Sequence, residues 1–352
     1  MYPRVTIDVK KYEENVRYMQ GLCRDNGLTM MAVTKVFCAA QPLVDVLNEL
    51  NVDFIADSRI ENLEAMKTDQ KKVLLRLPSI HEAERVIQHT DLSLNSEIKT
   101  VEALNEAAGR LGRCHGVILM IDIGDLREGV FYKENVLNTI REIKALKHID
   151  LTGIGTNLTC FGGIVPTADT LKKLIDVIDM AKRMLKTEFE IVSGGNSSHI
   201  HLLLKGKEIP EVNNLRLGES LILGRETAYG KTIDNMHQDV ITLEADLIEI
   251  KHKPSFPEGE IGMNAFGQVP KFDDYGLMKR GILAIGKQDV DYHEIIPYDT
   301  RIRLVGSSSD HIIVDLTNTE NDYQVGDVLK FKLSYGSLLS VMTSKYVGKR
   351  YV

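Results

Sequence analysis

Short apolar runs and amphipathic stretches alternate along the first two thirds of the chain. The apolar runs are continuous, as in Val117–Ile121, which favours strands buried on both faces. The stretches between them have helical spacing, clearest over residues 168–185, where Leu171 and Leu174 lie on one face. About eight such units fit into residues 11–230 and predict a closed (β/α)8 barrel of the TIM type, for which about 250 residues are typical.

The expected barrel strands are short and are followed by helical patterns. They are Met30–Val33, Phe54–Ala56, Val73–Leu77, Ser93–Asn95, Val117–Ile121, Leu151–Ile154, Phe189–Val192 and Leu221–Leu223. A doubly wound open sheet is the structural alternative to a closed barrel. No GxGxxG motif follows an early strand, which argues against a dinucleotide-binding sheet.

The pattern changes after about residue 235, where strand-like segments separated by turn residues replace the long helical stretches. The sequence therefore predicts a barrel domain over residues 11–234 and a β-rich C-terminal domain over residues 235–352. The opening segment Arg4–Asp8 reads as a strand that precedes the barrel and could pair with the C-terminal domain. We therefore assign residues 1–10 to that domain. The expected strands of that domain are Val240–Ile250, Gly281–Ile285, Thr300–Val305, His311–Leu316 and Val328–Leu333.

Charge and hydropathy exclude several classes of protein. The 352 residues include 43 Lys and Arg against 50 Asp and Glu, a net charge of −7, so the basic surface typical of nucleic-acid binding is missing. No apolar stretch is long enough to span a bilayer, and the first residues do not have the pattern of a signal peptide. Neither nucleic acid nor a membrane is expected as a partner.

The cysteines and histidines predict neither disulfides nor a metal site. The four cysteines are widely spaced and form no CxxC pair, which predicts free thiols in a reducing, cytoplasmic compartment. His199 and His201 are two residues apart and would not share one face of a helix. No metal is therefore expected.

Lys35 directly follows the apolar run Met30–Val33. The C-terminal ends of barrel strands form the active-site face of such folds. A lysine amine between apolar neighbours is partly desolvated, which favours its neutral, nucleophilic form and suits a Schiff base with a carbonyl group. A surface lysine that ends a strand is the alternative.

Three further segments that lie next to expected strands carry residue types that bind anions. Residues 193–198 combine two glycines with serines. Glycines let the backbone approach an anion closely, and late loops of barrels often hold phosphate. Residues 215–220 and 122–129 contain Arg216 and Arg127, which can bind an anionic oxygen. Flexible polar loops and structural arginine–glutamate pairs are alternative interpretations.

In their order and spacing these motifs resemble the fold-type III pyridoxal-phosphate enzymes of the alanine racemase family. The resemblance covers nearly the whole chain, and Ala32–Lys35 looks like the family's cofactor-lysine motif. Residues 56–59 and 281–290 are most similar to the ornithine racemase branch, rather than to the branch that supplies alanine to the cell wall.

The resemblance implies pyridoxal 5'-phosphate as the cofactor, attached to Lys35. Further cofactor contacts that it implies are Asn157, Asn196, Ser197, Arg216, Gly218 and Tyr351, with Arg216 facing the pyridine nitrogen. It also implies that Arg127 lies in the active site and that Ser309 and Asp310 contact the substrate carboxylate across a homodimer.

The chain departs from the family pattern at three positions. The family's second base is a tyrosine after a glycine, whereas this chain has Lys287. Lys287 is therefore the aligned candidate for the second base, and Tyr292 is an alternative. Met120 stands where many members have a carbamylated lysine, so that modification is not expected. Ser309 replaces a methionine.

The resemblance implies a racemase that acts on ornithine or another basic amino acid. The distal amine of such a substrate needs an acidic or polar pocket, for which Asp125, Glu128, Asp289 and Asp310 are available. Alternatives are an alanine racemase of broad specificity, a fold-type III decarboxylase and a non-enzymatic pyridoxal-phosphate carrier. No cysteine follows Cys160, which disfavours the decarboxylase, and the added β domain disfavours the carrier.

Overall fold

The computed structural model describes residues 1–207 and 211–352. These residues form two compact units, one comprising Met1–Val9 with Asp239–Val352 and the other comprising Lys10–Gln238. Within the described residues, no helix has the length and apolar character needed to cross a membrane.

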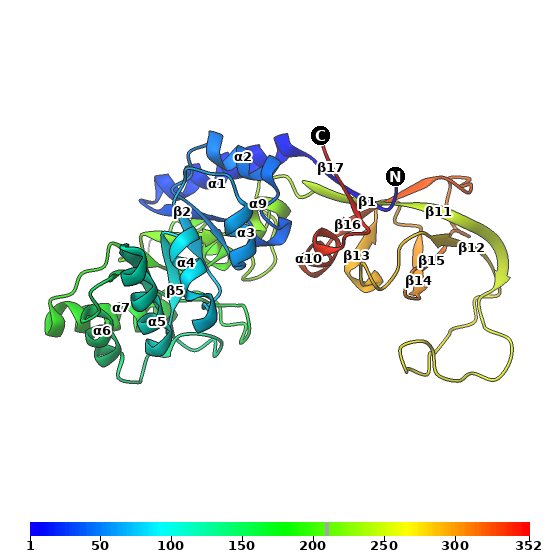
Figure 1. The fold of residues 1–352 in the computed structure, drawn as a ribbon. Coiled ribbons are helices and arrows are strands. Elements are labelled where there is room, and N and C mark those ends of the chain that lie inside the picture. Colours follow the sequence, from blue (N-terminus) through cyan, green and yellow to red (C-terminus); the bar gives the residue numbers. More distant parts are fainter. Residues whose placement is uncertain (208–210) are drawn as a thin grey trace. The chain divides into compact units, whose positions relative to one another are not determined.

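The unit over Lys10–Gln238 is built on a closed barrel of eight parallel strands (Figure 1). The strands are β2 (Thr29–Val33), β3 (Phe54–Asp57), β4 (Lys72–Leu74), β5 (Leu92–Asn95), β6 (His115–Asp122), β8 (Ile149–Gly155), β9 (Ile191–Ser193) and β10 (Asn214–Leu217). Each pairs with the next in this order, and β10 pairs with β2 to close the ring. The short β7 (Val130–Phe131) pairs with β6 outside the ring. The predicted (β/α)8 barrel is confirmed.

Helices and single helical turns connect the barrel strands. They are α1 (Val9–Asp25), η1 (Lys35–Phe37), α2 (Gln41–Glu49), α3 (Ile60–Ala65), η2 (Ile80–Glu82), α4 (Ala83–His89), α5 (Ile98–Leu111), α6 (Val136–Lys144), α7 (Ala168–Leu185), η3 (Ser197–His199), α8 (Ile200–Leu203) and α9 (Glu219–Leu223). Helix α7 shows why they form. The Thr167 side chain accepts a hydrogen bond from the backbone N–H of Thr170 at the helix start, and the apolar stripe with Leu171, Leu174 and Ile178 is buried.

One expected barrel strand is wrong. Leu221–Leu223 lies in helix α9, and the eighth strand of the barrel is β10 instead. A three-residue apolar run does not distinguish a strand from a buried helical turn. The actual strand contains Asn214 and Arg216, whose polar side chains conceal it in the sequence although both are buried.

Apolar side chains fill the barrel interior. They are Met31, Val33, Phe54, Ala56, Val73, Leu92, Leu94, Ile118, Met120 and Ile191. Gly153 of β8 pairs with Ile118, so it faces the same interior. A Cβ at Gly153 would lie 2.5 Å from the carbonyl oxygen of Ile191 and 3.0 Å from its Cβ. Only glycine therefore fits this point of the interior without displacing β9.

The other unit is an eight-stranded, mainly antiparallel sheet. Its strands are β1 (Arg4–Ile7), β11 (Ile241–Pro254), β12 (Leu277–Leu283), β13 (Ile295–Pro297), β14 (Arg303–Ser307), β15 (Ile312–Asp315), β16 (Val328–Leu333) and β17 (Gly348–Tyr351), with the helical turn η4 (Tyr292–Glu294) before β13. The main path runs β13-β16-β11-β12-β15-β14. Strand β1 pairs antiparallel with β11 and parallel with β17. The opening segment is thus part of the same sheet as the C-terminal strands.

One helix of this unit, α10 (Tyr335–Thr343), is not expected from the sequence. Its nine residues include Gly336 and two serines, which are weaker helix formers than alanine or leucine. The signal that was present is Ser334, whose side chain accepts a hydrogen bond from the backbone N–H of Ser337 as an N-terminal cap.

Replacing Gly153 by alanine is expected to lower the free energy of unfolding by about 1–3 kcal/mol, because the new methyl group collides with the β9 backbone. Gly21 is a matched control, since it lies inside helix α1 and a Cβ added there would have nothing within 4 Å. Gly21→Ala is expected to stabilise by about 0.5–1 kcal/mol. Urea unfolding followed by circular dichroism measures both, and equal effects of the two changes would contradict the packing described for Gly153.

Candidate active site

Lys35 is the first residue of η1 and lies at the C-terminal end of β2, where it is half-buried. The turn that carries it is unusual, because Cys38 and Ala39 have φ angles of 52° and 50°. Left-handed backbone costs about 1–2 kcal/mol for a residue with a side chain. The turn is held by the carbonyl oxygen of Thr34, which accepts from the N–H groups of Phe37 at 3.1 Å and Ala39 at 3.3 Å.

Arg216 places a buried guanidinium at the same end of the barrel. Its strand β10 pairs with β2 so that Arg216 lies opposite Met31 and faces the interior. The guanidinium donates to Ser193 Oγ at 2.5 Å, to the carbonyl oxygen of Thr156 at 2.7 Å and to Asn157 Oδ1 at 3.3 Å. Burial lowers the pKa of Arg216 to about 10, so it remains a fixed positive charge at neutral pH.

Asn196 ties the loops after β8 and β9 together. Its Nδ2 donates to the carbonyl oxygen of Leu158 at 2.9 Å, to Asn157 Oδ1 at 3.2 Å and to Cys160 Sγ at 3.3 Å. Its Oδ1 accepts from the N–H of Ser198 at 2.8 Å. Asn157 Oδ1 thus accepts from both Asn196 and Arg216. Asn157 Nδ2, on the other side of the same amide, therefore points away from these two partners.

Two close contacts hold the start of helix α9, one from Ser197 in the loop after β9 and one between Gly218 and β2. Ser197 Oγ lies 3.1 Å from Ser220 Oγ and accepts from the N–H of Ser220 at 3.3 Å. Gly218 directly follows β10, and a Cβ there would lie 3.0 Å from Val33 Cβ. The backbone of Gly218 therefore approaches the end of β2 just before the Lys35 turn.

Three buried polar atoms beside these loops have no hydrogen-bond partner. They are Thr156 Oγ1, Asn157 Nδ2 and Ser198 Oγ. Buried polar groups are nearly always hydrogen-bonded, and leaving one unsatisfied costs about 1–3 kcal/mol. Together with the buried positive charge of Arg216, these donors fit an anionic ligand with several oxygen acceptors.

Asp125 organises the neighbouring loop. Its buried carboxylate accepts four backbone N–H groups at 3.0–3.2 Å, those of Thr159, Cys160, Phe161 and Ile164. The exposed Arg127 forms a two-point ion pair with Glu128. Both charges of that pair act on Arg216, so all three lie in one electrostatic environment. Asp125 and Glu128 are therefore already engaged by other groups of the barrel.

In the β unit, the loops that carry Lys287, Ser309 and Asp310 are bound to each other. The N–H of Lys287 donates to the carbonyl oxygen of Ser308 at 2.9 Å, and the next N–H, of Gln288, donates to that of Ser309 at 3.0 Å. A Cβ at Gly286 would overlap the backbone of Ser309, so this close approach requires glycine. The Nζ of the exposed Lys287 lies 4.3 Å from the ring centre of Phe266.

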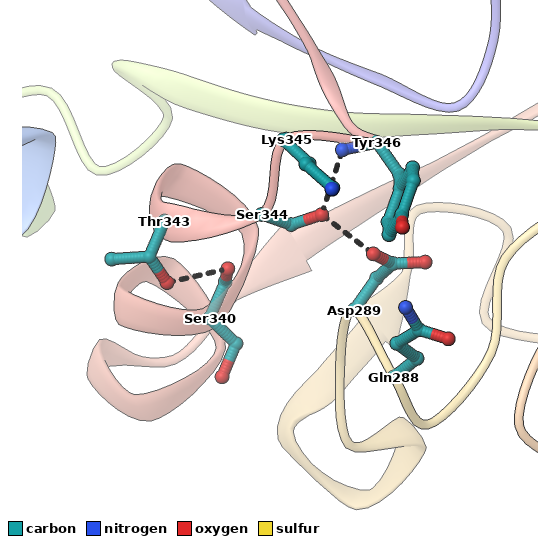
Figure 2. A pocket seen from close by; sticks show the side chains of 7 residues that line it. All are labelled: Gln288, Asp289, Ser340, Thr343, Ser344, Lys345 and Tyr346. Atoms are coloured by element: carbon teal, nitrogen blue, oxygen red, sulfur yellow. Dashed lines mark hydrogen bonds between the residues drawn. The ribbon is translucent and has the colours of Figure 1, made fainter.

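A cavity of about 380 Å³ lies beside this pair of loops (Figure 2). It is lined by Gln288, Asp289, Ser340, Thr343, Ser344, Lys345 and Tyr346. Figure 2 shows Asp289 turned toward Ser344, whose hydroxyl donates to Asp289 Oδ1 at 2.6 Å. This contact fixes the Lys287 loop to the end of α10.

Tyr351 is the last residue of β17 and pairs with Ile7 of β1. The structure thus gathers Lys35, Asn157, Asn196, Ser197, Arg216 and Gly218 at one end of the barrel, with Arg127 in the same electrostatic environment. It places Lys287, Ser309, Asp310 and Tyr351 in the β unit. Within the described ranges, no group of three or more His, Cys, Asp or Glu side chains is arranged to hold a metal.

Sequence reasoning missed Ser193 and Thr156 as partners of the Arg216 guanidinium. A signal was present, since each residue is polar and ends or directly follows a barrel strand. It also missed the structural role of Asp125, because the position of its four backbone donors depends on the folded path of the loop that follows β8.

Comparisons with known proteins agree on one family. The family model described as the alanine racemase N-terminal domain matches residues 7–226. An ornithine racemase from Acetoanaerobium sticklandii is 47% identical over 351 residues, which cover 99% of each chain. A lysine racemase from Thermotoga maritima is 37% identical over 355 residues, covering 100% of this chain and 99% of that one.

Solved structures with the same fold include alanine racemases. That of Clostridium difficile 630 has a TM-score of 0.77 at 18% identity and covers 100% of this chain and 96% of its own. That of Bartonella henselae, which has covalently bound pyridoxal phosphate, has a TM-score of 0.75 at 18% identity and covers 100% of both chains. At this identity the likeness establishes the fold alone.

The buried histidines of the barrel predict a loss of stability in mild acid. His115 Nε2 lies 2.8 Å from Ser93 Oγ. Burial lowers the pKa of His115 to about 4, and burial lowers the pKa of His199 to the same value. Between pH 6.5 and 4 the unfolded chain therefore binds protons that the folded chain does not. The free energy of unfolding should fall as the pH falls, by about 2 kcal/mol per histidine at pH 5.

Urea unfolding of the protein and of His115→Gln at pH 7.5 and pH 5 checks this pH dependence. The variant is expected to lose about 2 kcal/mol less than the parent protein between the two pH values. Identical pH dependence of the two proteins would contradict the buried, neutral state of His115.

Proposed function

The chain belongs to the alanine racemase family, and we propose that it is a pyridoxal-phosphate-dependent racemase that interconverts L- and D-ornithine. The observation that carries this proposal is the end-to-end similarity to a curated ornithine racemase. The second curated relative is named as a lysine racemase, which favours a basic substrate over alanine. The resemblance read from the sequence motifs is thereby confirmed at the level of the family.

The residues at the C-terminal end of the barrel fit the cofactor. Lys35 would hold it covalently, and Asn157, Asn196, Ser197, Arg216 and Gly218, with Tyr351 of the β unit, would contact it. The unsatisfied Ser198 Oγ and Asn157 Nδ2 are donors that a phosphate and an aromatic oxygen can satisfy. Once bound, pyridoxal phosphate supplies an electron sink that makes the α-hydrogen of an amino acid acidic.

Arg216 supports racemisation rather than transamination. A guanidinium donates hydrogen bonds and does not readily release a proton. Three neutral oxygens hold the Arg216 side chain in place. A cofactor ring nitrogen held beside this guanidinium would stay unprotonated, which would limit the withdrawal of electrons from the substrate's α-carbon and favour return of the proton to that carbon.

Racemisation needs one proton-transfer group on each side of the α-carbon. We assign the amine of Lys35 to one side and the amine of Lys287 to the other. Tyr292, the first residue of η4 in the same unit, is the alternative. The loop that binds the Lys287 loop carries Ser309, which we assign with Arg127 to the substrate carboxylate.

Lys287 would come from the β unit of a second copy of the chain, in a homodimer. The loop between β11 and β12, residues 255–276, extends beyond the ends of its strands (Figure 1). Its exposed side chains include Phe256, Ile261, Met263, Phe266, Val269, Phe272 and Tyr275. Apolar surface of this extent is typical of interaction sites, and Phe266 joins it directly to Lys287.

The free thiols of all four cysteines support a reducing, cytoplasmic compartment for this enzyme. Among the acidic residues considered for the distal amine of ornithine, Asp125 and Glu128 are engaged within the barrel. We therefore place this role on Asp289 or Asp310 of the β unit.

Chiral chromatography of the cofactor-loaded protein with single-enantiomer amino acids tests the activity. D-ornithine is expected from L-ornithine, with alanine slower. Lys35→Ala is expected to lower the rate at least about 10³-fold, because it removes both the covalent attachment and one proton-transfer group. Lys147→Ala is the control, since Lys147 is exposed and precedes β8 at the opposite end of the barrel.

Each other outcome of this assay would point to a different function. Alanine as the best substrate would contradict the assignment of ornithine. Release of carbon dioxide would indicate a decarboxylase, and a protein that binds the cofactor at Lys35 without inverting any amino acid would be a carrier.

Mixed dimers test the assignment of Lys287 and the shared site together. Lys35→Ala and Lys287→Ala homodimers should both be inactive. A heterodimer purified through two different tags has one intact site if Lys287 acts in the partner's barrel, so about half of the wild-type rate per dimer is expected. A heterodimer as inactive as its parents, or an active Lys287→Ala homodimer, would contradict the assignment.

A further inference from the structure

A buried hydrogen bond joins the residue before Lys35 to the end of the neighbouring strand. Val33 of β2 pairs with Ala56 of β3, and both face the barrel interior. The next residues, Thr34 and Asp57, therefore point to the other side of the sheet. Thr34 Oγ1 donates to Asp57 Oδ2 at 2.6 Å, and both residues are fully buried.

The two carboxylate oxygens of Asp57 have separate roles. Oδ1 accepts from the N–H of Arg59 at 2.9 Å and from Asn62 Nδ2 at 3.0 Å, which holds the start of helix α3. Oδ2 accepts from Thr34. All of these donors are neutral groups. Burying a carboxylate among neutral donors is costly, and an uncharged side chain would suffice to cap a helix of six residues.

Thr34 determines the path of the chain at Lys35. Its backbone N–H donates to the carbonyl oxygen of Ala56 at 2.9 Å, which continues the ladder between the strands. Its carbonyl oxygen accepts two of the hydrogen bonds that close the turn with the left-handed Cys38 and Ala39, those from Phe37 and Ala39. Fixing the side chain of Thr34 thus fixes the point from which the Lys35 side chain departs.

We propose that Asp57 is a positioning residue that acts through Thr34 to hold Lys35 where its amine binds the cofactor and reaches the substrate. This inference rests on the proposed function and deepens it. It assigns to Asp57 and Thr34 a role that differs from the capping of α3, because only Oδ2 of Asp57 faces the Lys35 turn.

Two substitutions separate the role of each oxygen. Thr34→Val keeps the branched shape and removes the hydroxyl donor to Oδ2. Asn62→Ala removes the side-chain donor to Oδ1 and leaves the Lys35 turn untouched, so it is the matched control. Thr34→Ser is the conservative variant that retains the hydroxyl. Asp57→Asn keeps the shape of the side chain and replaces the Oδ2 acceptor, and it serves if Thr34→Val does not fold.

Three readouts apply to each variant in addition to the melting temperature. The fraction of chains with cofactor at Lys35 is measured by borohydride reduction and peptide mapping. The pH dependence of the absorbance of the bound cofactor reports the surroundings of the link. Steady-state kinetics with L-ornithine separate kcat from KM.

Thr34→Val is expected to weaken cofactor binding about tenfold, to shift the pH profile of the absorbance and to lower kcat about tenfold with KM changed less than about twofold, because misplaced reacting groups lose rate rather than binding. Asn62→Ala and Thr34→Ser are expected to stay within about twofold of the parent protein in all three readouts. Asn62→Ala should nevertheless lower the melting temperature.

Equal effects of Thr34→Val and Asn62→Ala, or an unchanged absorbance profile in Thr34→Val, would overturn the positioning role. Failure of the proposed function has a different signature in the unmodified protein. If borohydride mapping finds the cofactor on another residue, or if Lys35 is labelled but no amino acid is inverted, the function itself is wrong. In the latter case the labelling and absorbance readouts still decide the role of Asp57.

Discussion

The buried charge of Arg216 is the interaction on which the candidate active site depends. Closure of the barrel between β10 and β2 places Arg216 opposite Met31 and turns its guanidinium into the interior. A charge in this position needs acceptors, and the ends of the two preceding strands provide them, as Ser193 Oγ and the carbonyl oxygen of Thr156. Gly155 pairs with Ser193 and leaves space for the Ser193 side chain, because a Cβ at Gly155 would lie 3.1 Å from the Cβ of Ser193. Barrel closure and solvation of one guanidinium therefore determine where the loops after β8 and β9 begin.

The parts of the fold that were predictable are those with a long periodic signal. The helical stretch 168–185 matches α7 in both bounds, because more than three turns of apolar spacing leave little ambiguity. The eighth strand was not predictable in the same way, since polar side chains that serve the interior occupy half of β10. A strand whose polar residues are satisfied by tertiary partners looks like a loop in the sequence.

A similar limit applies to the candidate site. Lys35 and the arginine of β10 could be proposed from their positions beside apolar runs, because the ends of barrel strands converge. The hydrogen bond between Thr34 and Asp57 could not, since it depends on the register of β2 against β3. Nor could the sequence show that the carboxylate of Asp125 would be occupied by four backbone N–H groups, because that depends on how residues 156–164 fold back toward β6.

The buried carboxylates of Asp57 and Asp125 are bonded in the same way. Each is bonded only to neutral donors, and each holds a segment that carries proposed site residues, Asp57 through the Lys35 turn and Asp125 through the loop after Asn157. A carboxylate used in this way has its lone pairs occupied and is a poor partner for a substrate ammonium group. Selectivity for a basic side chain then falls to acids on other loops. This is why we look to Asp289 and Asp310, on the two joined loops of the β unit, rather than to the barrel.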